Sequence, residues 1–172
     1  VGFTEIMYTI TLTSLTKAAA PVAGTPTDML MFVAYGGEYT ENAWDMCWAN
    51  EADNASGIEA TTAVANVGDT VTIGLKMPQT VFHTWYMAPV IVVDGLTELD
   101  YTIDSITIDG KEVLDTVDLT VGDSEWWYEG TGTYTAEQSI RLKGGYNEWA
   151  AQAFATSPVG FTEIMYTITI NS

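Results

Sequence analysis

The chain of 172 residues contains one cysteine and one histidine, and these two shortages limit its chemistry. With Cys47 alone, no disulfide can form within the chain, so the fold depends on its hydrophobic core. No motif supplies His83 with a nucleophile and an orienting acid, and a histidine within a strand is more often structural than catalytic. The grouped histidines and cysteines of a zinc site are missing as well. We therefore expect no catalytic residues.

Basic residues are also scarce. Five Lys and Arg stand against 23 Asp and Glu, which gives a net charge of −18. Such a surface repels nucleic acids and anionic membranes, so the expected partners are neutral or basic. No run of 18 apolar residues is present, so no transmembrane helix is expected. The abundance of Thr, Gly, Asn, Ser, Trp and Tyr is typical of secreted bacterial β-domains, and we expect an extracellular protein.

Helical periodicity is absent too, because apolar residues nowhere recur at helical spacing for three turns. Short alternating or apolar runs separated by turn residues instead predict an all-β fold, a β-sandwich of jelly-roll type. The predicted strands are Met29–Tyr35 ending at Gly36-Gly37, Ile58–Ala65 paired with Thr70–Leu75, Val81–Val93 broken by Pro89, Ile103–Ile108 before the turn Asp109-Gly110, Val117–Val121, Glu125–Glu129, Gln138–Leu142 and a final strand ending at Ile170. Tyr146–Phe154 is either a strand or a single helical turn.

One segment occurs twice. Residues 1–11 and 159–169 both read VGFTEIMYTIT, and their alternation predicts a strand with Ile164, Tyr166, Ile168 and Ile170 on one face. We expect residues 1–15 to be the last strand of a preceding homologous module, residues 16–27 a proline-marked linker and residues 28–172 the domain itself. In the alternative, the segment is an edge strand whose two copies compete for one position, so that molecules exchange strands.

Tryptophan is the informative residue type. Trp44, Trp48 and Trp149 are flanked by polar residues, whereas Trp85 has apolar neighbours and is equally compatible with the core. Glu125–Glu129 places Trp126 and Tyr128 on one face and Trp127 on the other, so at least one large ring faces outward. Exposed indoles indicate a binding surface, and a planar, uncharged pyranose ring suits them.

Several segments occur together in a recognisable order: Val67–Ile73, Ile103–Val113, Ile140–Leu142 leading to Asn147-Glu148-Trp149, and the closing Glu163–Ile170. This pattern resembles the β-jelly-roll carbohydrate-binding modules of bacterial cellulases, and most of all family 65. The resemblance implies a non-catalytic module, one of a tandem pair attached to an endoglucanase, that binds β-1,4-glucan and prefers xyloglucan. It implies these ligand-binding residues: Trp44, Trp48, Trp85, Trp126, Tyr128 and Trp149 for stacking, with Gln138 and Gln152 for sugar hydroxyls.

Three further interpretations stay open at this point. If Trp127 faces outward, then Trp126 and Tyr128 belong to the core. The acidic stretches Glu51–Asn54 and Asp94–Asp100 are either solvated turns or a structural calcium site, and since no EF-hand loop is present we predict no cofactor. A small glycoside hydrolase would need two carboxylates across a cleft, and with 23 acidic residues their abundance alone is no evidence for it.

Overall fold

The structure is a computed structural model that describes residues 29–41, 46–49, 57–92, 99–120, 139–149 and 153–172. These residues form strands and one short 3₁₀ helix, with no α-helix among them, which confirms the all-β class. The elements are β1 (Met29–Glu38), β2 (Met46–Ala49), β3 (Glu59–Thr61), β4 (Ala63–Ala65), β5 (Thr70–Lys76), β6 (His83–Val92), β7 (Tyr101–Ile108), β8 (Lys111–Glu112), η1 (Leu114–Thr116), β9 (Ser139–Arg141), β10 (Tyr146–Asn147) and β11 (Glu163–Ile170). The predicted leader strand 1–15, the linker 16–27 and the strand Glu125–Glu129 lie outside the described residues. Within the described part of the chain, no helix is both long and apolar enough to span a bilayer.

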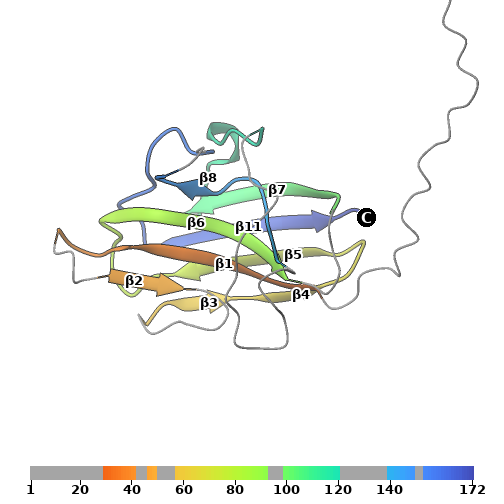
Figure 1. Ribbon diagram of the computed structural model, residues 1–172, viewed down its shortest axis with the longest axis horizontal. Coiled ribbons are helices and arrows are strands. Elements are labelled where there is room, and N and C mark those ends of the chain that lie inside the picture. The colour runs from red at the N-terminus through yellow and green to blue at the C-terminus, as the bar shows by residue number, and fades with distance from the viewer. Residues whose placement is uncertain (1–28, 42–45, 50–56, 93–98, 121–138, 150–152) are drawn as a thin grey trace, which may run out of the picture.

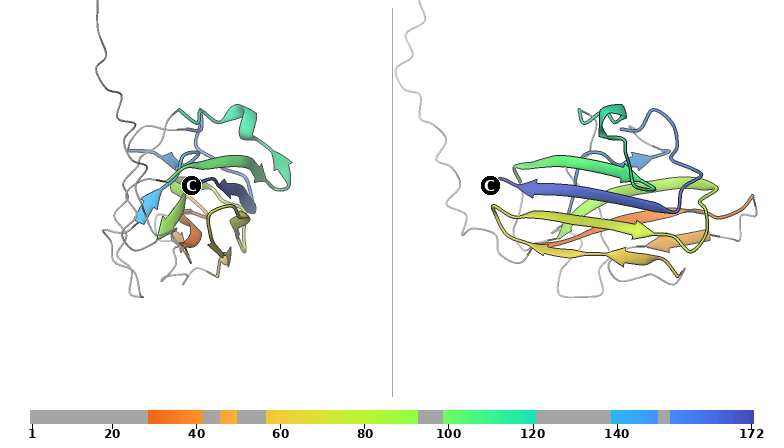
Figure 2. Two further views of the ribbon diagram at one scale, coloured as in Figure 1. Left: turned by 90° about the vertical axis from the view of Figure 1, so that its right-hand side faces the viewer. Right: turned by 180° about the vertical axis from the view of Figure 1, so that it is seen from behind.

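The strands form two sheets packed face to face, as Figure 1 and the end-on view in Figure 2 show. The first, here called the β6 sheet, has the order β10-β6-β1-β2, with β9 also pairing with β6 and β4 with β1. The second, the β11 sheet, has the order β3-β5-β11-β7-β8. All the strand pairs of both sheets are antiparallel. The predicted β-sandwich is therefore confirmed, whereas its jelly-roll connectivity stays a prediction.

The second copy of the duplicated sequence forms the centre of the β11 sheet. β11 lies between β5 and β7, and the four residues predicted to share one face, Ile164, Tyr166, Ile168 and Ile170, are fully buried. The interpretation of this segment as an edge strand is wrong, because it pairs on both sides along nearly its whole length. Burial of one complete face explains why its alternation was so clear in the sequence.

β1 continues past the point where the sequence predicted its end. Gly36 and Gly37 do not terminate the strand but lie opposite a β-bulge in β6, where Gly36 pairs with Tyr86, Gly37 pairs with Thr84 and Trp85 is the extra residue. A Cβ atom at Gly37 would overlap the carbonyl oxygen of His83 and the hydroxyl of Tyr35. Glycine is needed here for close approach and not for a turn, so β1 extends to Glu38.

Two other predicted strands differ from the structure. The segment predicted as one strand over Ile58–Ala65 is two, because the chain bends at Thr62 and passes from β3 at the edge of the β11 sheet to β4 in the β6 sheet. Its predicted pairing with the strand that follows is confirmed for β3, which pairs with β5. Pro89 does not break β6. Its carbonyl accepts a hydrogen bond from the N–H of Leu142, so the edge of Pro89 that lacks an N–H faces the short gap between β9 and β10, where no strand needs that donor.

The predicted strand Val117–Val121 is absent from the described residues, where Val117 makes only an isolated bridge to Phe154. The chain leaves η1 at this point, and the carboxylate of Asp118 accepts hydrogen bonds from the N–H and hydroxyl of Thr120. That local turn competes with strand pairing. Tyr146–Phe154, whose conformation the sequence left open, begins as the two-residue strand β10.

The first and last described strands begin and end at the same end of the sandwich. Met29 at the start of β1 pairs with Ala65, and the carbonyl of Ile170 at the end of β11 accepts a hydrogen bond from the N–H of Gly68. Ala65 and Gly68 are three residues apart, so the start of β1 and the end of β11 are close neighbours. Glu38, at the other end of β1, is roughly 30 Å away at the usual strand rise.

Candidate functional site

The outer face of the β6 sheet divides into an apolar half and a polar half. Alternation along β1 and β6 sends residues such as Tyr35 and Met87 into the core between the sheets. The outward residues of the apolar half form a second buried cluster, consisting of Phe32, Ala34, Val90 and Val92, with Leu30 and Tyr86 packed against it. This half lies toward Met29 and the chain ends.

Tyr86 marks the boundary between the two halves. The guanidinium of Arg141, on the neighbouring strand β9, lies over the Tyr86 ring at 5.7 Å from its centroid, a cation–π contact. Burial raises the pKa of Tyr86 to about 12, and the nearby Arg141 charge offsets part of that rise. The Tyr86 hydroxyl is therefore neutral at physiological pH, and the ring serves as packing surface.

The polar half is centred on His83. The His83 Nε2 atom lies 2.9 Å from Glu148 Oε2, and Nδ1 lies 3.8 Å from Glu38 Oε2. The Trp85 ring stands edge-on to the imidazole, with 6.4 Å between the ring centroids. The His83 side chain is 38% exposed, so a ligand on this face can reach it. We call the set Glu38, His83, Trp85, Asn147, Glu148 and Trp149 the His83 site.

A buried threonine fixes the backbone beneath this site. Thr84, between His83 and Trp85, points inward, donates a hydrogen bond to the carbonyl of Pro158 and pairs with the Tyr35 hydroxyl at 3.2 Å. The Thr84 carbonyl in turn accepts a hydrogen bond from the Ser157 hydroxyl. Because Thr84 is tied at both side chain and backbone, the two outward-facing rings beside it stand on a rigid support.

The turn after β10 supplies the other side of the site. The N–H of Glu148 donates to the carbonyl of Trp85 at 2.9 Å, and the N–H of Trp149 donates to the side-chain oxygen of Asn147 at 3.1 Å. Trp149 is 71% exposed, which is the largest exposure among the large hydrophobic residues of the described ranges. An indole held by its backbone yet open to solvent is suited to contact a planar ligand.

The structure describes only part of the predicted binding set. Trp149 is exposed, as its polar neighbours indicated. Trp85, which the sequence left equally compatible with the core and with the surface, is half-buried on the outer face beside His83. Trp48 lies in β2, where its backbone pairs with Gly36, but its side chain is outside the described set. Trp44, Trp126, Trp127, Tyr128, Gln138 and Gln152 lie outside the described residues.

Sequence reasoning did not identify the two carboxylates that flank His83. Glu38 and Glu148 come from β1 and from the turn after β10, which are more than 100 residues apart. A weak signal was present, since His83 and Trp85 are two residues apart in a strand and therefore share a face. Nothing local to either glutamate indicated that it joins them.

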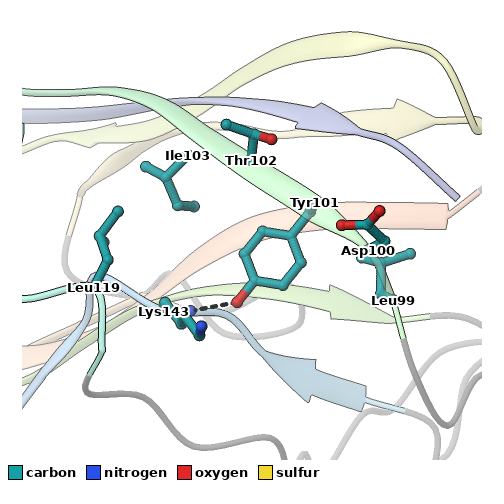
Figure 3. Close-up of a pocket in the computed structure, with 7 residues that line it drawn as sticks. All are labelled: Leu99, Asp100, Tyr101, Thr102, Ile103, Leu119 and Lys143. Carbon is teal, nitrogen blue, oxygen red and sulfur yellow. Dashed lines mark hydrogen bonds between the residues drawn. The ribbon is translucent and has the colours of Figure 1, made fainter.

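A separate pocket of about 360 Å³ opens at the edge of the sandwich, between β7 and the segment that follows β9 (Figure 3). It is lined by Leu99, Asp100, Tyr101, Thr102, Ile103, Leu119 and Lys143. The Tyr101 ring points across it and its hydroxyl accepts a hydrogen bond from the N–H of Lys143 at 2.9 Å. None of the predicted binding residues lines this pocket, and it is apart from the His83 site.

Among the described residues, no three His, Cys, Asp or Glu side chains are grouped so as to hold a metal ion. Asp100 is the described member of the acidic stretch Asp94–Asp100, and its carboxylate pairs with the side-chain amide of Asn171 at 3.4 Å. Glu51–Asn54 is outside the described ranges.

Comparison of the chain with models of protein families, with curated proteins and with solved structures yields no match.

Proposed function

We propose that the His83 site, on the outer face of the β6 sheet, binds the chains of a neutral plant β-1,4-glucan, with xyloglucan preferred, and that the protein is a non-catalytic module. The observation that carries the proposal is Trp149, an indole 71% exposed in the turn that is hydrogen-bonded through Glu148 to the backbone of Trp85. Indole faces stack on the C–H faces of sugars, while carboxylates accept hydrogen bonds from the hydroxyls at their rims.

The charge of the chain supports a neutral polymer. A net charge of −18 opposes binding of pectins and other polyanions, whereas stacking on tryptophan needs no charge on the ligand. The resemblance to carbohydrate-binding modules of family 65 agrees with this ligand class. It also motivates the proposals that the protein is secreted and that a tandem module and an endoglucanase domain belong to the same polypeptide.

Isothermal titration against xyloglucan, barley mixed-linkage β-glucan and pectin tests the proposal. We expect xyloglucan to bind more tightly than the mixed-linkage glucan, and pectin not to bind. Trp149→Ala should weaken xyloglucan binding by about tenfold or more, the loss typical of a stacked aromatic residue at about 1–3 kcal/mol.

A matched control is Val64→Ala. Val64 is also apolar and 58% exposed, but it pairs with Leu30 at the opposite end of the same sheet. Equal affinity of wild type and Trp149→Ala for xyloglucan would show that this indole does not contact the ligand. Release of reducing ends from xyloglucan by the purified protein would instead make it a hydrolase.

A further inference from the structure

The two ring nitrogens of His83 have different environments. Glu148 Oε2 is within hydrogen-bonding distance of Nε2, whereas Glu38 Oε2, at 3.8 Å from Nδ1, is too far for a direct hydrogen bond. A carboxylate accepts and does not donate, so in the neutral form of the ring the hydrogen is on Nε2 and Nδ1 presents a lone pair. Nδ1 and Glu38 Oε2 are then two acceptors that face each other across a gap.

Two acceptors at this spacing can receive two hydrogens from outside the protein. One hydroxyl has a single hydrogen and satisfies only one of them. Two adjacent equatorial hydroxyls of a pyranose ring can donate one hydrogen each, one to Nδ1 and one to Glu38 Oε2. We propose that His83 and Glu38 form a subsite for the free 2,3-diol of one backbone glucose, and so determine which substituted glucans the protein accepts.

The surroundings of the gap fit this role. The Trp85 ring lies beside the imidazole and nearly perpendicular to it, and the exposed Trp149 directly follows the glutamate that holds Nε2. Thr84 anchors the backbone between His83 and Trp85 from within the core, which keeps the acceptors in place before a ligand arrives. Glu38 is only 14% exposed, so solvent competes weakly for its hydrogen bonds.

This inference rests on the proposed function and predicts a specificity that stacking alone does not produce. Stacking tolerates methylation at any position that leaves the ring face open. A diol subsite rejects a sugar whose hydroxyls at positions 2 and 3 are methylated and accepts one methylated at position 6.

The experiment measures the affinities of two cello-oligosaccharides, one 2,3-di-O-methylated and one 6-O-methylated. For the wild type we expect the 6-O-methyl ligand to bind at least about tenfold more tightly, because the other ligand leaves two partly buried acceptors unpaired. His83→Phe keeps an aromatic ring beside Trp85 but removes Nδ1. Glu38→Gln keeps the side-chain volume but supplies an amide N–H that can pair with Nδ1. Both variants should bind the 6-O-methyl ligand more weakly, so that the affinity ratio falls toward one.

Glu59→Gln is the matched control for charge, since Glu59 is exposed in β3 of the other sheet. It should retain the wild-type ratio, and thermal unfolding should show that all three variants are folded. A double variant should lose less affinity than the sum of the two single losses, because both residues serve the same diol.

The outcomes separate the two proposals. If the 6-O-methyl ligand and xyloglucan bind, Trp149→Ala abolishes binding, and the two methylated ligands bind wild type equally, the diol subsite is wrong and the stacking surface stands. If neither xyloglucan nor either oligosaccharide binds wild type, both proposals fail. Tighter binding of a glucosamine oligosaccharide than of the 6-O-methyl ligand would show that the paired acceptors serve an ammonium group, which also overturns the diol assignment.

Discussion

Single side chains hold the two sheets together through hydrogen bonds that cross the core. Tyr166, on the central strand β11, is fully buried and its hydroxyl donates to the carbonyl of Gly144 at 2.9 Å. Burial raises the pKa of Tyr166 well above its ordinary value, so the hydroxyl stays protonated and remains a donor. Gly144 lies between β9 and β10, so this bond joins the β11 sheet to the segment that leads to Trp149.

We expect Tyr166→Phe to lower the free energy of unfolding by about 1–3 kcal/mol, because it leaves the buried Gly144 carbonyl without its partner. Tyr101→Phe is the comparison: the Tyr101 hydroxyl accepts from the N–H of Lys143 at a half-exposed position, where water can replace it. Urea denaturation measures both losses. A Tyr101→Phe loss as large as that of Tyr166→Phe would contradict the importance of burial.

At the residue scale, the sequence predicted which side chains are exposed or buried better than it predicted which side chains contact each other. The polar neighbours of Trp149 indicated an exposed indole, and the alternation of Ile164, Tyr166, Ile168 and Ile170 indicated a buried face. The sequence did not reveal that Glu38 and Glu148 flank His83. Side-chain pairs of that kind depend on strand order and register, which a single sequence does not encode locally.

The clearest element is the hairpin of β7 and β8. Asp109 and Gly110 both have positive φ, 47° and 75°, which is the turn geometry that the Asp-Gly pair predicted. Its two carboxylates also fix it to its surroundings. Asp109 accepts hydrogen bonds from the N–H and hydroxyl of Thr162 and the N–H of Glu163, and Glu112 accepts from Ser105, Ile106, Val113 and Leu114.

These hydrogen bonds make the hairpin sensitive to acid. The pKa of Asp109 is lowered chiefly by the N–H of Thr162, and the pKa of Glu112 chiefly by the Ser105 hydroxyl. A lowered pKa stabilises the fold above the ordinary carboxyl pKa, 3.8 for Asp and 4.5 for Glu, and that stabilisation disappears as the pH falls through the lowered folded value.

Glu112→Gln should therefore be less stable than wild type at pH 7, and the difference should shrink as the pH falls below 4.5. The measurement is the free energy of unfolding of both proteins at several pH values between 7 and about 3, the range in which carboxylates protonate. Glu59→Gln is the control, because it removes the same charge at an exposed edge position. A difference between wild type and Glu112→Gln that is independent of pH would contradict the role of the carboxylate.

The remaining elements show where local reasoning fails. Gly36-Gly37 and Pro89 were predicted to interrupt strands, yet each lies within one, because a bulge and a gap between neighbouring strands accommodate them. Ile58–Ala65 was predicted as one strand, but its two halves belong to different sheets. In each case the position of a neighbouring strand decides the outcome, and that information comes from tertiary structure.

At the scale of the whole molecule, the feature with the clearest consequence is the excess of negative charge. With a net charge of −18, the folded state repels itself, and added salt screens this repulsion. We expect the melting temperature to rise when NaCl is increased from low concentration to about 0.5 M, where the Debye length is only a few ångströms. Over the same range, the affinity for xyloglucan should change by less than about twofold, because a neutral ligand releases no counterions.

The control for this measurement is sucrose, which stabilises proteins by exclusion from their surface without screening charge. A strong loss of xyloglucan affinity with salt would show that binding depends on charge and would contradict the neutral stacking surface. A melting temperature that falls with salt would show that repulsion among the acidic groups does not destabilise the folded state.

The start of β1 and the end of β11 lie on one side of the sandwich. Met29 and Ile170 meet at one end of the sandwich, and the His83 site is at the other, roughly 30 Å away along β1. The described strands thus begin and end on the side of the sandwich opposite the His83 site. If the proposed function holds, this separation leaves the His83 site as a free tip, accessible to a polysaccharide without interference from these two strand ends.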